Sequence, residues 1–341
     1  MDDPAPPLVE QSKRRTALLR SPAFFGHETG GHPEAPRRIA AIESALAAAG
    51  LADARPEVPF GPSGLAPLER VHDLAYLDGL EELALAGGGA LDADTLVRRD
   101  SWEVALLGAG AAVAAVDAVL DGRAEAAFAL VRPPGHHATP GRGMGFCLVN
   151  NAAVAAAHAV ARGLDRVLVV DWDVHHGNGT QDAFWERGDV FFASLHQWPL
   201  YPGTGSAGER GGGPGLGFTL NVPLPAGTGD AAFLAAFDAT VLPAVRAYRP
   251  QLVVVSAGFD AHAADPLAGM RLSEAGFAAL AGRVAALADE HAGGRLVAVL
   301  EGGYDPAALG RSVVATVRAF DGAGSNDRDG GDRLGTDGSR R

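Results

Sequence analysis

Short apolar segments alternate with longer helical stretches along this chain, and this alternation constrains the fold more than any other feature. Apolar runs of this length are typical of buried strands. They cover residues 128–131, 167–170, 190–194, 218–222, 252–256 and 296–300. Apolar residues at helical spacing predict helices over residues 34–49, 65–86, 101–120, 151–162, 231–248 and 274–291. The alternation predicts an α/β fold in which helices cover both faces of a mainly parallel sheet.

The length of 341 residues would by itself suggest about two domains. No linker-like composition divides the middle of the chain, however, so we predict a single domain over residues 17–322. Residues 1–16 are polar and proline-rich, and residues 323–341 are rich in Gly, Asp, Ser and Arg. Because neither end offers apolar side chains to bury, we expect both ends to be disordered.

The composition excludes several kinds of site. The single lysine, Lys13, lies in the N-terminal arm, which argues against Schiff-base catalysis and a Walker-A phosphate site. The single cysteine, Cys147, excludes disulfides within the chain and cysteine-cluster zinc sites, and we expect a cytoplasmic protein. The net charge of −13 argues against nucleic acid as a partner. No run of about 18 uncharged apolar residues is present, so we expect no membrane span.

Polar and titratable residues follow five of the predicted strands. In chain order these residues are His136 and His137, Asp173 and His175, His196, Asp260, and Tyr304. Ligands of open parallel sheets bind at the carboxyl ends of the strands. We therefore expect these side chains to converge on one edge of the sheet.

The segment Asp173-Val-His175 predicts a metal site. Alternate residues of an extended segment point the same way, so one carboxylate and one imidazole can bind the same ion. Asp260, at the end of another strand, is the natural third ligand. Two carboxylates and one histidine suit a catalytic Zn²⁺, with Fe²⁺ as a competitor. The alternative is that Asp173 caps the following turn and His175 is an ordinary loop histidine.

His136 and His137 follow a Pro-Pro-Gly turn, and as neighbours in an extended loop they point to different sides. One can accept a proton from a water molecule and the other can orient or shuttle. Asp171 and Asn178 are available to set their tautomers. The alternative is a surface loop.

Tyr304 follows Gly302 and Gly303, which allow close backbone approach. Its phenol can stabilise an oxyanion opposite a metal. The alternative is an ordinary half-buried tyrosine.

Seven sequence motifs together resemble the zinc-dependent histone deacetylase superfamily, which includes bacterial deacetylase-like proteins and acetylpolyamine amidohydrolases. They appear in family order as RPPGHHA, MGFCLVNNAAVAA, VVDWDVHHGNGTQ, SLHQ, PGTG, SAGFDAH and LEGGYD. Trp172 and Asn178 resemble the class II branch. The resemblance implies the three-layer arginase/deacetylase fold, with a central, mainly parallel sheet of about eight strands.

The resemblance also implies a role for each matching residue. Asp173, His175 and Asp260 would bind one Zn²⁺, His137 would be the general base and acid with His136 as its electrostatic partner, and Tyr304 would bind the scissile carbonyl. Asp171 and Asn178 would support the two histidines. Gly145, Phe146 and Tyr201 would line the acyl-lysine tunnel, and Arg38 would lie at the internal acetate exit. A structural K⁺ would contact Asp171, Asp173, His175, Ser194 and Leu195, and a second K⁺ would lie near Phe184, Arg187, Val190 and Phe218.

The expected activity is release of acetate from an acetylated primary amine. Acetyl-lysine in proteins and a small acetylpolyamine both fit this core, and Asp92 and Asp94 in a variable loop are candidates for holding a cationic substrate end. A homo-oligomer is compatible with the resemblance. Two alternatives remain: a non-catalytic protein that binds acylated amines, and an arginase-like ureohydrolase, which needs further aspartates for a second metal.

Overall fold

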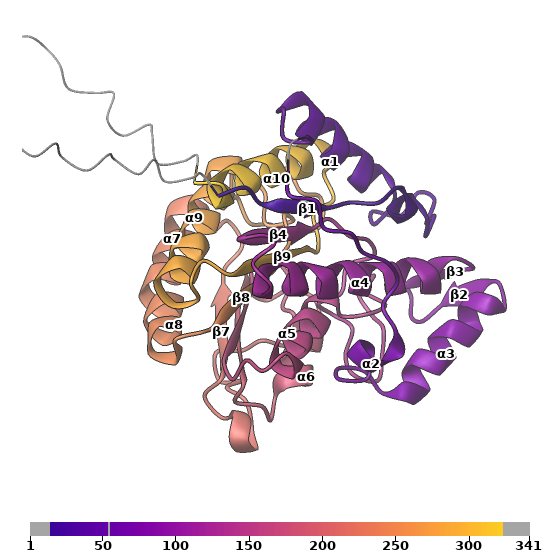
Figure 1. The fold of residues 1–341 in the computed structure, drawn as a ribbon, viewed down its shortest axis with the longest axis horizontal. Coiled ribbons are helices and arrows are strands. Elements are labelled where there is room, and N and C mark those ends of the chain that lie inside the picture. Colours follow the sequence, from indigo (N-terminus) through magenta and orange to yellow (C-terminus); the bar gives the residue numbers. More distant parts are fainter. Residues whose placement is uncertain (1–13, 54, 323–341) are drawn as a thin grey trace, which may run out of the picture.

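The computed structural model describes residues 14–53 and 55–322, and its centre is one parallel sheet (Figure 1). Every pair of neighbouring strands in this sheet is parallel. Within the described residues the sheet has seven strands, where about eight were expected. In spatial order they are β1 (Ala17–Leu19), β4 (Ala126–Ala129), β9 (Leu296–Leu300), β8 (Leu252–Ala257), β5 (Val167–Asp171), β6 (Val190–Gln197) and β7 (Thr219–Leu224).

Helices cover both faces of the sheet and confirm the α/β class (Figure 1). One face carries α4 (Ser101–Leu120) and α5 (Asn151–Ala161), and the other carries α1 (Arg37–Ala48), α9 (Glu274–His291) and α10 (Pro306–Phe320). Local signals set where these helices begin. The Ser273 side chain accepts a hydrogen bond from the Gly276 amide at the start of α9, and Asp305 accepts one from Ala308 before α10.

The helix predicted over residues 65–86 is instead two helices, α2 (Leu65–Leu68) and α3 (Leu74–Leu85). The chain turns between them because His72 is buried and bonded elsewhere. Its Nδ1 lies 3.0 Å from the Thr139 carbonyl oxygen, and its Nε2 accepts from the Asn150 amide at 2.9 Å. Tertiary hydrogen bonds therefore override the helical periodicity at this point.

The helix predicted over residues 231–248 is interrupted as well. It consists of α7 (Asp230–Ala236), a π-helical turn (Phe237–Val241) and α8 (Leu242–Tyr248). Pro243 cannot donate a backbone hydrogen bond, which favours an irregular turn at this position. By length and apolar composition, α4 and the Asp230–Tyr248 segment are both capable of crossing a membrane. Most of the apolar stretch of α4 is buried inside the protein, as in a core helix.

Sequence patterns did not predict several smaller elements. Strand β1 has three residues, too few for a pattern, and α10 follows the last predicted strand. The remaining elements are the hairpin β2 (Gly88–Ala90) and β3 (Leu96–Arg98), α6 (Asn178–Phe184), and short 3₁₀ turns at Pro22–Phe25 and Gly213–Gly215.

The N-terminal arm predicted over residues 1–16 is described only from residue 14. Thr16, which we assigned to the N-terminal arm, is buried, and its amide and hydroxyl both donate to Asp321. Residues 1–13 and 323–341 lie outside the described residues.

The register of β5, β6, β8 and β9 places their carboxyl ends at the same edge of the sheet. Asp171 at the end of β5 pairs with Ser194 of β6 on one side and with Ser256 of β8 on the other. Ser256 in turn pairs with Val299 of β9. The segments that follow these strands therefore leave the sheet side by side, as expected for a parallel sheet.

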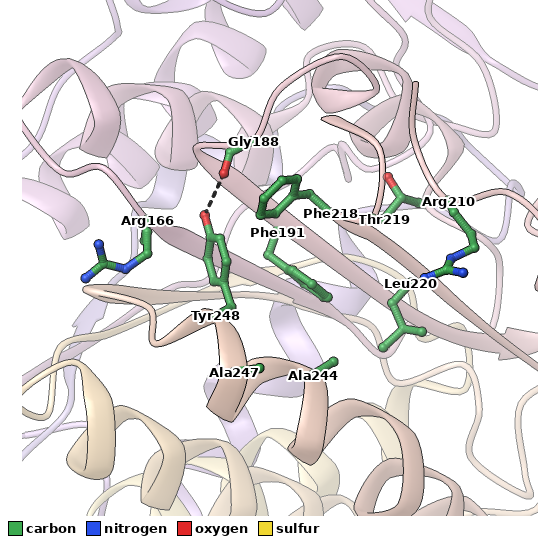
Figure 2. Close-up of a pocket in the computed structure, with 11 residues that line it drawn as sticks. Arg166, Gly188, Phe191, Arg210, Phe218, Thr219, Leu220, Ala244, Ala247 and Tyr248 are labelled. Carbon is green, nitrogen blue, oxygen red and sulfur yellow. Dashed lines mark hydrogen bonds between the residues drawn. The ribbon is translucent and has the colours of Figure 1, made fainter. Parts of the chain in front are cut away.

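A cavity of about 520 Å³ lies at the opposite end of the sheet (Figure 2). Gly188 precedes β6 and Thr219 begins β7, so the cavity borders the amino ends of these strands and α8. Phe191, Phe218 and Tyr248 form its aromatic wall, with ring centroids 5.3–6.4 Å apart.

Candidate active site

The segments after β4, β5, β8 and β9 bring the predicted site residues together at the carboxyl edge. Asp173, His175 and Asp260 form one cluster, in which potential ligand atoms all lie within 4.8 Å of one another. Nδ1 of His175 is 3.1 Å from Asp173 Oδ1 and 3.2 Å from Asp260 Oδ2. The alternative of a capping Asp173 with an unrelated loop histidine does not account for the third side chain.

Burial makes this cluster electrostatically costly unless a cation is close. Burial and the charge of Asp173 raise the pKa of Asp260 to about 7. Burial alone would lower the pKa of His175, but hydrogen bonds and charges from both carboxylates raise it to about 10. The imidazolium of His175 thus supplies the positive charge that a metal ion would supply instead.

The backbone of the Glu301–Gly303 turn approaches the same carboxylates. The Gly302 amide donates to Asp173 Oδ2 at 2.8 Å. A Cβ on Gly302 would overlap the carboxylates of Asp260 and Asp173, so only glycine fits this position.

The two neighbouring histidines have different partners. His136 Nδ1 lies 2.9 Å from Asp171 Oδ2, and His137 Nδ1 lies 2.8 Å from Asn178 Oδ1. Burial would lower the pKa of His136, but the charges of Asp173 and Asp171 raise it well above its usual value. Burial, together with the charges of His136 and His175, lowers the pKa of His137 well below its usual value. His136 is therefore suited to carry a positive charge and His137 to be neutral.

Tyr304 lies beside the cluster and is buried. Its amide donates to Asp265 Oδ2 at 2.6 Å, and the Arg38 guanidinium lies 4.9 Å from its ring centroid. Burial raises the pKa of Tyr304 well above its usual value, and Asp260 and Asp173 add to the shift while Arg38 opposes it. The phenol therefore keeps its proton and can donate it in a hydrogen bond.

Gly145, Phe146 and Tyr201 form aromatic and backbone walls around these groups. The Tyr201 ring meets His137 edge-on at 5.1 Å, and the Phe146 ring meets Tyr304 edge-on at 5.6 Å. Gly145 has φ +56°, and a Cβ there would come within 2.5 Å of the His137 ring. Phe146 also has positive φ, and its amide donates to Thr95 Oγ1 at 3.2 Å.

Asp92 and Asp94 lie in the β2–β3 turn, close to this wall. Asp92 Oδ1 accepts from the amides of Asp94 and Thr95. Burial and the neighbouring Asp92 raise the pKa of Asp94. Burial raises the pKa of Tyr201, and the charges of Asp92 and Asp94 add to this shift. Asp94 is exposed, so the turn offers negative charge to solvent beside Tyr201.

The residues assigned to potassium by resemblance fall into two groups. Asp171 and Ser194 pair across β5 and β6, beside Leu195. In the second group the Arg187 amide donates to the Phe184 carbonyl at 3.0 Å, and the Phe192 amide donates to the Phe218 carbonyl at 2.9 Å. Val190 begins β6 near this second group.

Sequence reasoning missed Glu301, although it directly follows a predicted strand. Its Oε2 accepts from the amides of Gly135 and His136, at 2.6 and 3.1 Å. Burial raises the pKa of Glu301 to about 7. Its position at a strand end was the available signal.

His196 was expected at this edge, but together with His176 it forms a separate network. His176 Nδ1 lies 2.8 Å from Thr204 Oγ1, and His196 Nε2 lies 2.9 Å from the Gly205 carbonyl. Glu209 accepts from the Gly205 amide. These contacts attach the loop that bears Tyr201 to the body of the protein.

Residues 14–53 and 55–322 contain two groups of three metal-ligating side chains. One is the Asp173–His175–Asp260 cluster and the other comprises His136, Cys147 and Glu301. Neither group has the extra aspartates that a two-metal ureohydrolase requires. The fold and the site thus define an α/β protein with a candidate single-metal centre at the carboxyl edge of its sheet.

Comparisons with known proteins identify the family. Residues 32–320 match the model of the histone deacetylase domain, and the chain belongs to this family. The histone deacetylase-like amidohydrolase of Pseudomonas aeruginosa is 46% identical over 301 residues, which cover 88% of this chain and 79% of that protein. A probable deacetylase of Archaeoglobus fulgidus is 41% identical over 292 residues, or 85% of this chain and 81% of that protein.

A solved structure of a relative has the same fold as this chain. The crystal structure of the HDA15 HD domain superposes with a TM-score of 0.86 at 37% identity, covering 90% of this chain and 89% of that chain. These matches confirm the predicted family and its α/β fold.

Proposed function

We propose that the protein is a zinc-dependent deacetylase that hydrolyses an acetylated primary amine to acetate and the free amine. The observation that carries the proposal is the Asp173–His175–Asp260 cluster beside a neutral, buried His137. Membership of the histone deacetylase family supports hydrolysis of acetylated amines by a metal-dependent site.

The donor set of the cluster fits Zn²⁺. Two carboxylates and one imidazole are ligands that zinc accepts in catalytic sites, and they leave a coordination position open. The raised pKa of Asp260, caused by burial and by Asp173, indicates that two carboxylates here need a cation. When bound, Zn²⁺ supplies a Lewis acid that polarises the amide carbonyl and acidifies water.

His137 removes the proton from the attacking water through Nε2, because its Nδ1 is bonded to Asn178. The water oxygen forms a bond to the carbonyl carbon, and the Tyr304 phenol donates to the oxygen that gains negative charge. The C–N bond then breaks as a protonated histidine delivers a proton to the leaving nitrogen. One water is consumed, and acetate and amine are formed.

The charge of His136 opposes a positive charge on His137, so His136 sets the basicity of its neighbour. The bond from His136 to Asp171 favours the protonated form of His136, so we assign it the electrostatic role. A charged His136 also keeps His137 neutral before substrate binds, which suits His137 as the base.

The two acids of the β2–β3 turn favour a cationic substrate, and the exposed Arg142, 3.9 Å from Asp92, offsets only part of their charge. Asp92 and Asp94 lie beside Tyr201, and a positively charged group carried by the substrate would meet them outside the tunnel. Peptides with acetyl-lysine beside basic residues and acetylpolyamines both satisfy this requirement.

A substrate panel tests the proposal. The purified protein is loaded with Zn²⁺ or Fe²⁺, and release of amine is measured from an acetyl-lysine peptide, N-acetylputrescine and N-acetylspermidine. We expect turnover of at least one substrate that disappears with a chelator and returns with metal. Absence of turnover with every substrate and either metal would contradict the proposed function and favour a non-catalytic binding protein.

A further inference from the structure

A second cluster of buried charges lies behind Tyr304. Glu34 is almost fully buried and lies between two fully buried arginines, Arg38 and Arg132. Its carboxylate accepts from Arg132 at 2.5 and 2.8 Å and from Arg38 at 3.2 Å. Burial alone would raise the pKa of Glu34, but the two arginines outweigh burial and lower the pKa to about 2.

Arg38 connects this cluster to the segment that bears the candidate catalytic tyrosine. Its Nε donates to the Gly303 carbonyl at 2.7 Å, and its Nη2 donates to the Glu301 carbonyl. The remaining nitrogen, Nη1, is the one that binds Glu34. All three nitrogens therefore have a partner, and the guanidinium plane lies 4.9 Å from the Tyr304 ring centroid.

Arg132 holds Glu34 from the opposite side. Its Nη1 donates to the carbonyls of Phe24 and Gly26, and its Nη2 donates to that of His27. Arg132 is thus anchored to the N-terminal segment by bonds that do not involve the site. A carboxylate held by two nitrogens of an anchored arginine has little freedom to move.

Stability is a weak explanation for such a cluster. The cost of burying ions offsets much of their attraction, so apolar residues of similar volume often stabilise a protein as well. Apolar residues make no hydrogen bonds, however, so they could not hold a neighbouring group in a defined orientation.

We propose that Glu34 is a positioning residue for the reaction. It orients Arg38, and Arg38 orients the Glu301–Gly303 turn so that the Tyr304 phenol reaches the substrate carbonyl. This inference rests on the proposed deacetylase function, because it assigns Glu34 an effect on the step that uses Tyr304.

A double-mutant cycle tests the proposal. Glu34→Gln is made in the wild-type chain and in the Tyr304→Phe chain, and kcat and KM are measured on the full-length, zinc-loaded proteins. We expect Glu34→Gln to lower kcat about 10-fold in the wild type, with KM within about 2-fold. In the Tyr304→Phe chain the same change is expected to lower kcat less than about 2-fold.

Two controls accompany the cycle. Glu43→Gln removes an acid that binds Arg20 at 2.7 Å and lies on α1, the helix that carries Arg38, and it is expected to leave kcat unchanged. Zinc content and thermal unfolding of every variant are measured alongside activity. If Glu34→Gln does not fold, Arg38→Lys takes its place in the cycle, because lysine keeps the charge but cannot bind Glu34 and both carbonyls together.

The outcomes separate the two proposals. Equal losses of kcat in both backgrounds, or a loss of zinc content with Glu34→Gln, would overturn the positioning role while the deacetylase function stands. A wild-type protein that hydrolyses no acetylated amine would overturn both.

Discussion

The two ends of the same sheet differ in the kind of group that they bury. At the carboxyl ends, titratable side chains are buried beside polar partners, as in the pairs His136–Asp171 and His137–Asn178. At the amino ends, a cavity of about 520 Å³ has aromatic walls, and its charged residues, Arg166 and Arg210, are exposed (Figure 2).

This difference teaches that an aromatic cavity alone does not supply groups for acid–base chemistry. Acid–base catalysis needs groups whose pKa values are shifted and whose orientation is fixed. Those groups lie at the carboxyl edge, where burial and the charge of Asp173 raise the pKa of Asp260 to about 7. Substitutions at the carboxyl edge should therefore affect activity more than substitutions at the amino-end cavity.

The largest effect is expected at Tyr304. Tyr304→Phe removes one hydroxyl, and with it the donor to the developing oxyanion. We expect kcat to fall by about 10²–10³-fold, the usual loss for one such donor. Steady-state kinetics measure this loss, and metal analysis should show that zinc content stays near the wild-type level. Wild-type turnover in this variant would refute the role of the phenol.

Acid should destabilise the protein through the buried His72, which binds the Thr139 carbonyl and the Asn150 amide. Burial lowers the pKa of His72 from 6.5 to about 4. The unfolded chain binds a proton below pH 6.5 that the folded chain does not accept until about pH 4, so stability is full above pH 6.5 and falls between these values. At pH 5 we expect His72 to lower the free energy of unfolding by about 2 kcal/mol relative to its value above pH 6.5.

Thermal unfolding at pH 7.5 and pH 5 measures this effect. His72→Gln removes the titrating group and should reduce the difference in Tm between the two pH values, even if the variant is less stable at both. An unchanged difference in Tm would show that His72 does not titrate in this range.

A smaller effect is expected in the β2–β3 turn, which carries Asp92 and Asp94. Asp94→Asn removes an exposed charge beside Tyr201, and surface charge pairs are worth about 0.2–1 kcal/mol. KM for N-acetylspermidine should rise about 2- to 5-fold, while KM for an uncharged acetyl-lysine amide should stay constant. Equal changes for both substrates would mean that Asp94 does not recognise charge.

The smallest effect is expected at the amino-end cavity. Arg210→Ala changes an exposed residue of its lining, so activity and unfolding free energy should stay within about 0.5 kcal/mol of the wild type. A loss of kcat comparable with that of Tyr304→Phe would show that the two ends of the sheet are functionally coupled.

The sequence was sufficient to predict the α/β class, six of the seven described strands of the sheet and most of the residues at its carboxyl edge. Buried strands such as Val167–Asp171 are apolar runs, and the rule for parallel sheets placed their polar successors together. Strand β1 was too short to form a pattern, and the break at His72 depends on Thr139 and Asn150, which are distant in sequence.

The supporting charges were harder to predict. Arg132 and Glu34 are 98 residues apart, and neither sequence context indicates that they meet. An acid in a loop is usually solvated, and only the fold shows that Glu34 is buried between two arginines. Asp171 and Asn178 were within reach of the sequence motifs, whereas the buried Glu34–Arg132 contact needed the three-dimensional structure.

Metal-dependent release of acetate tests the central claim most directly. The protein is stripped with a chelator, reloaded with one equivalent of Zn²⁺, and assayed for acetate and amine from an acetylated amine, with Asp260→Ala as the matched variant. The account predicts equal amounts of acetate and amine from the reloaded wild type, and neither product from the stripped protein or from Asp260→Ala. Turnover by the stripped protein, or by a variant that binds no zinc, would contradict it.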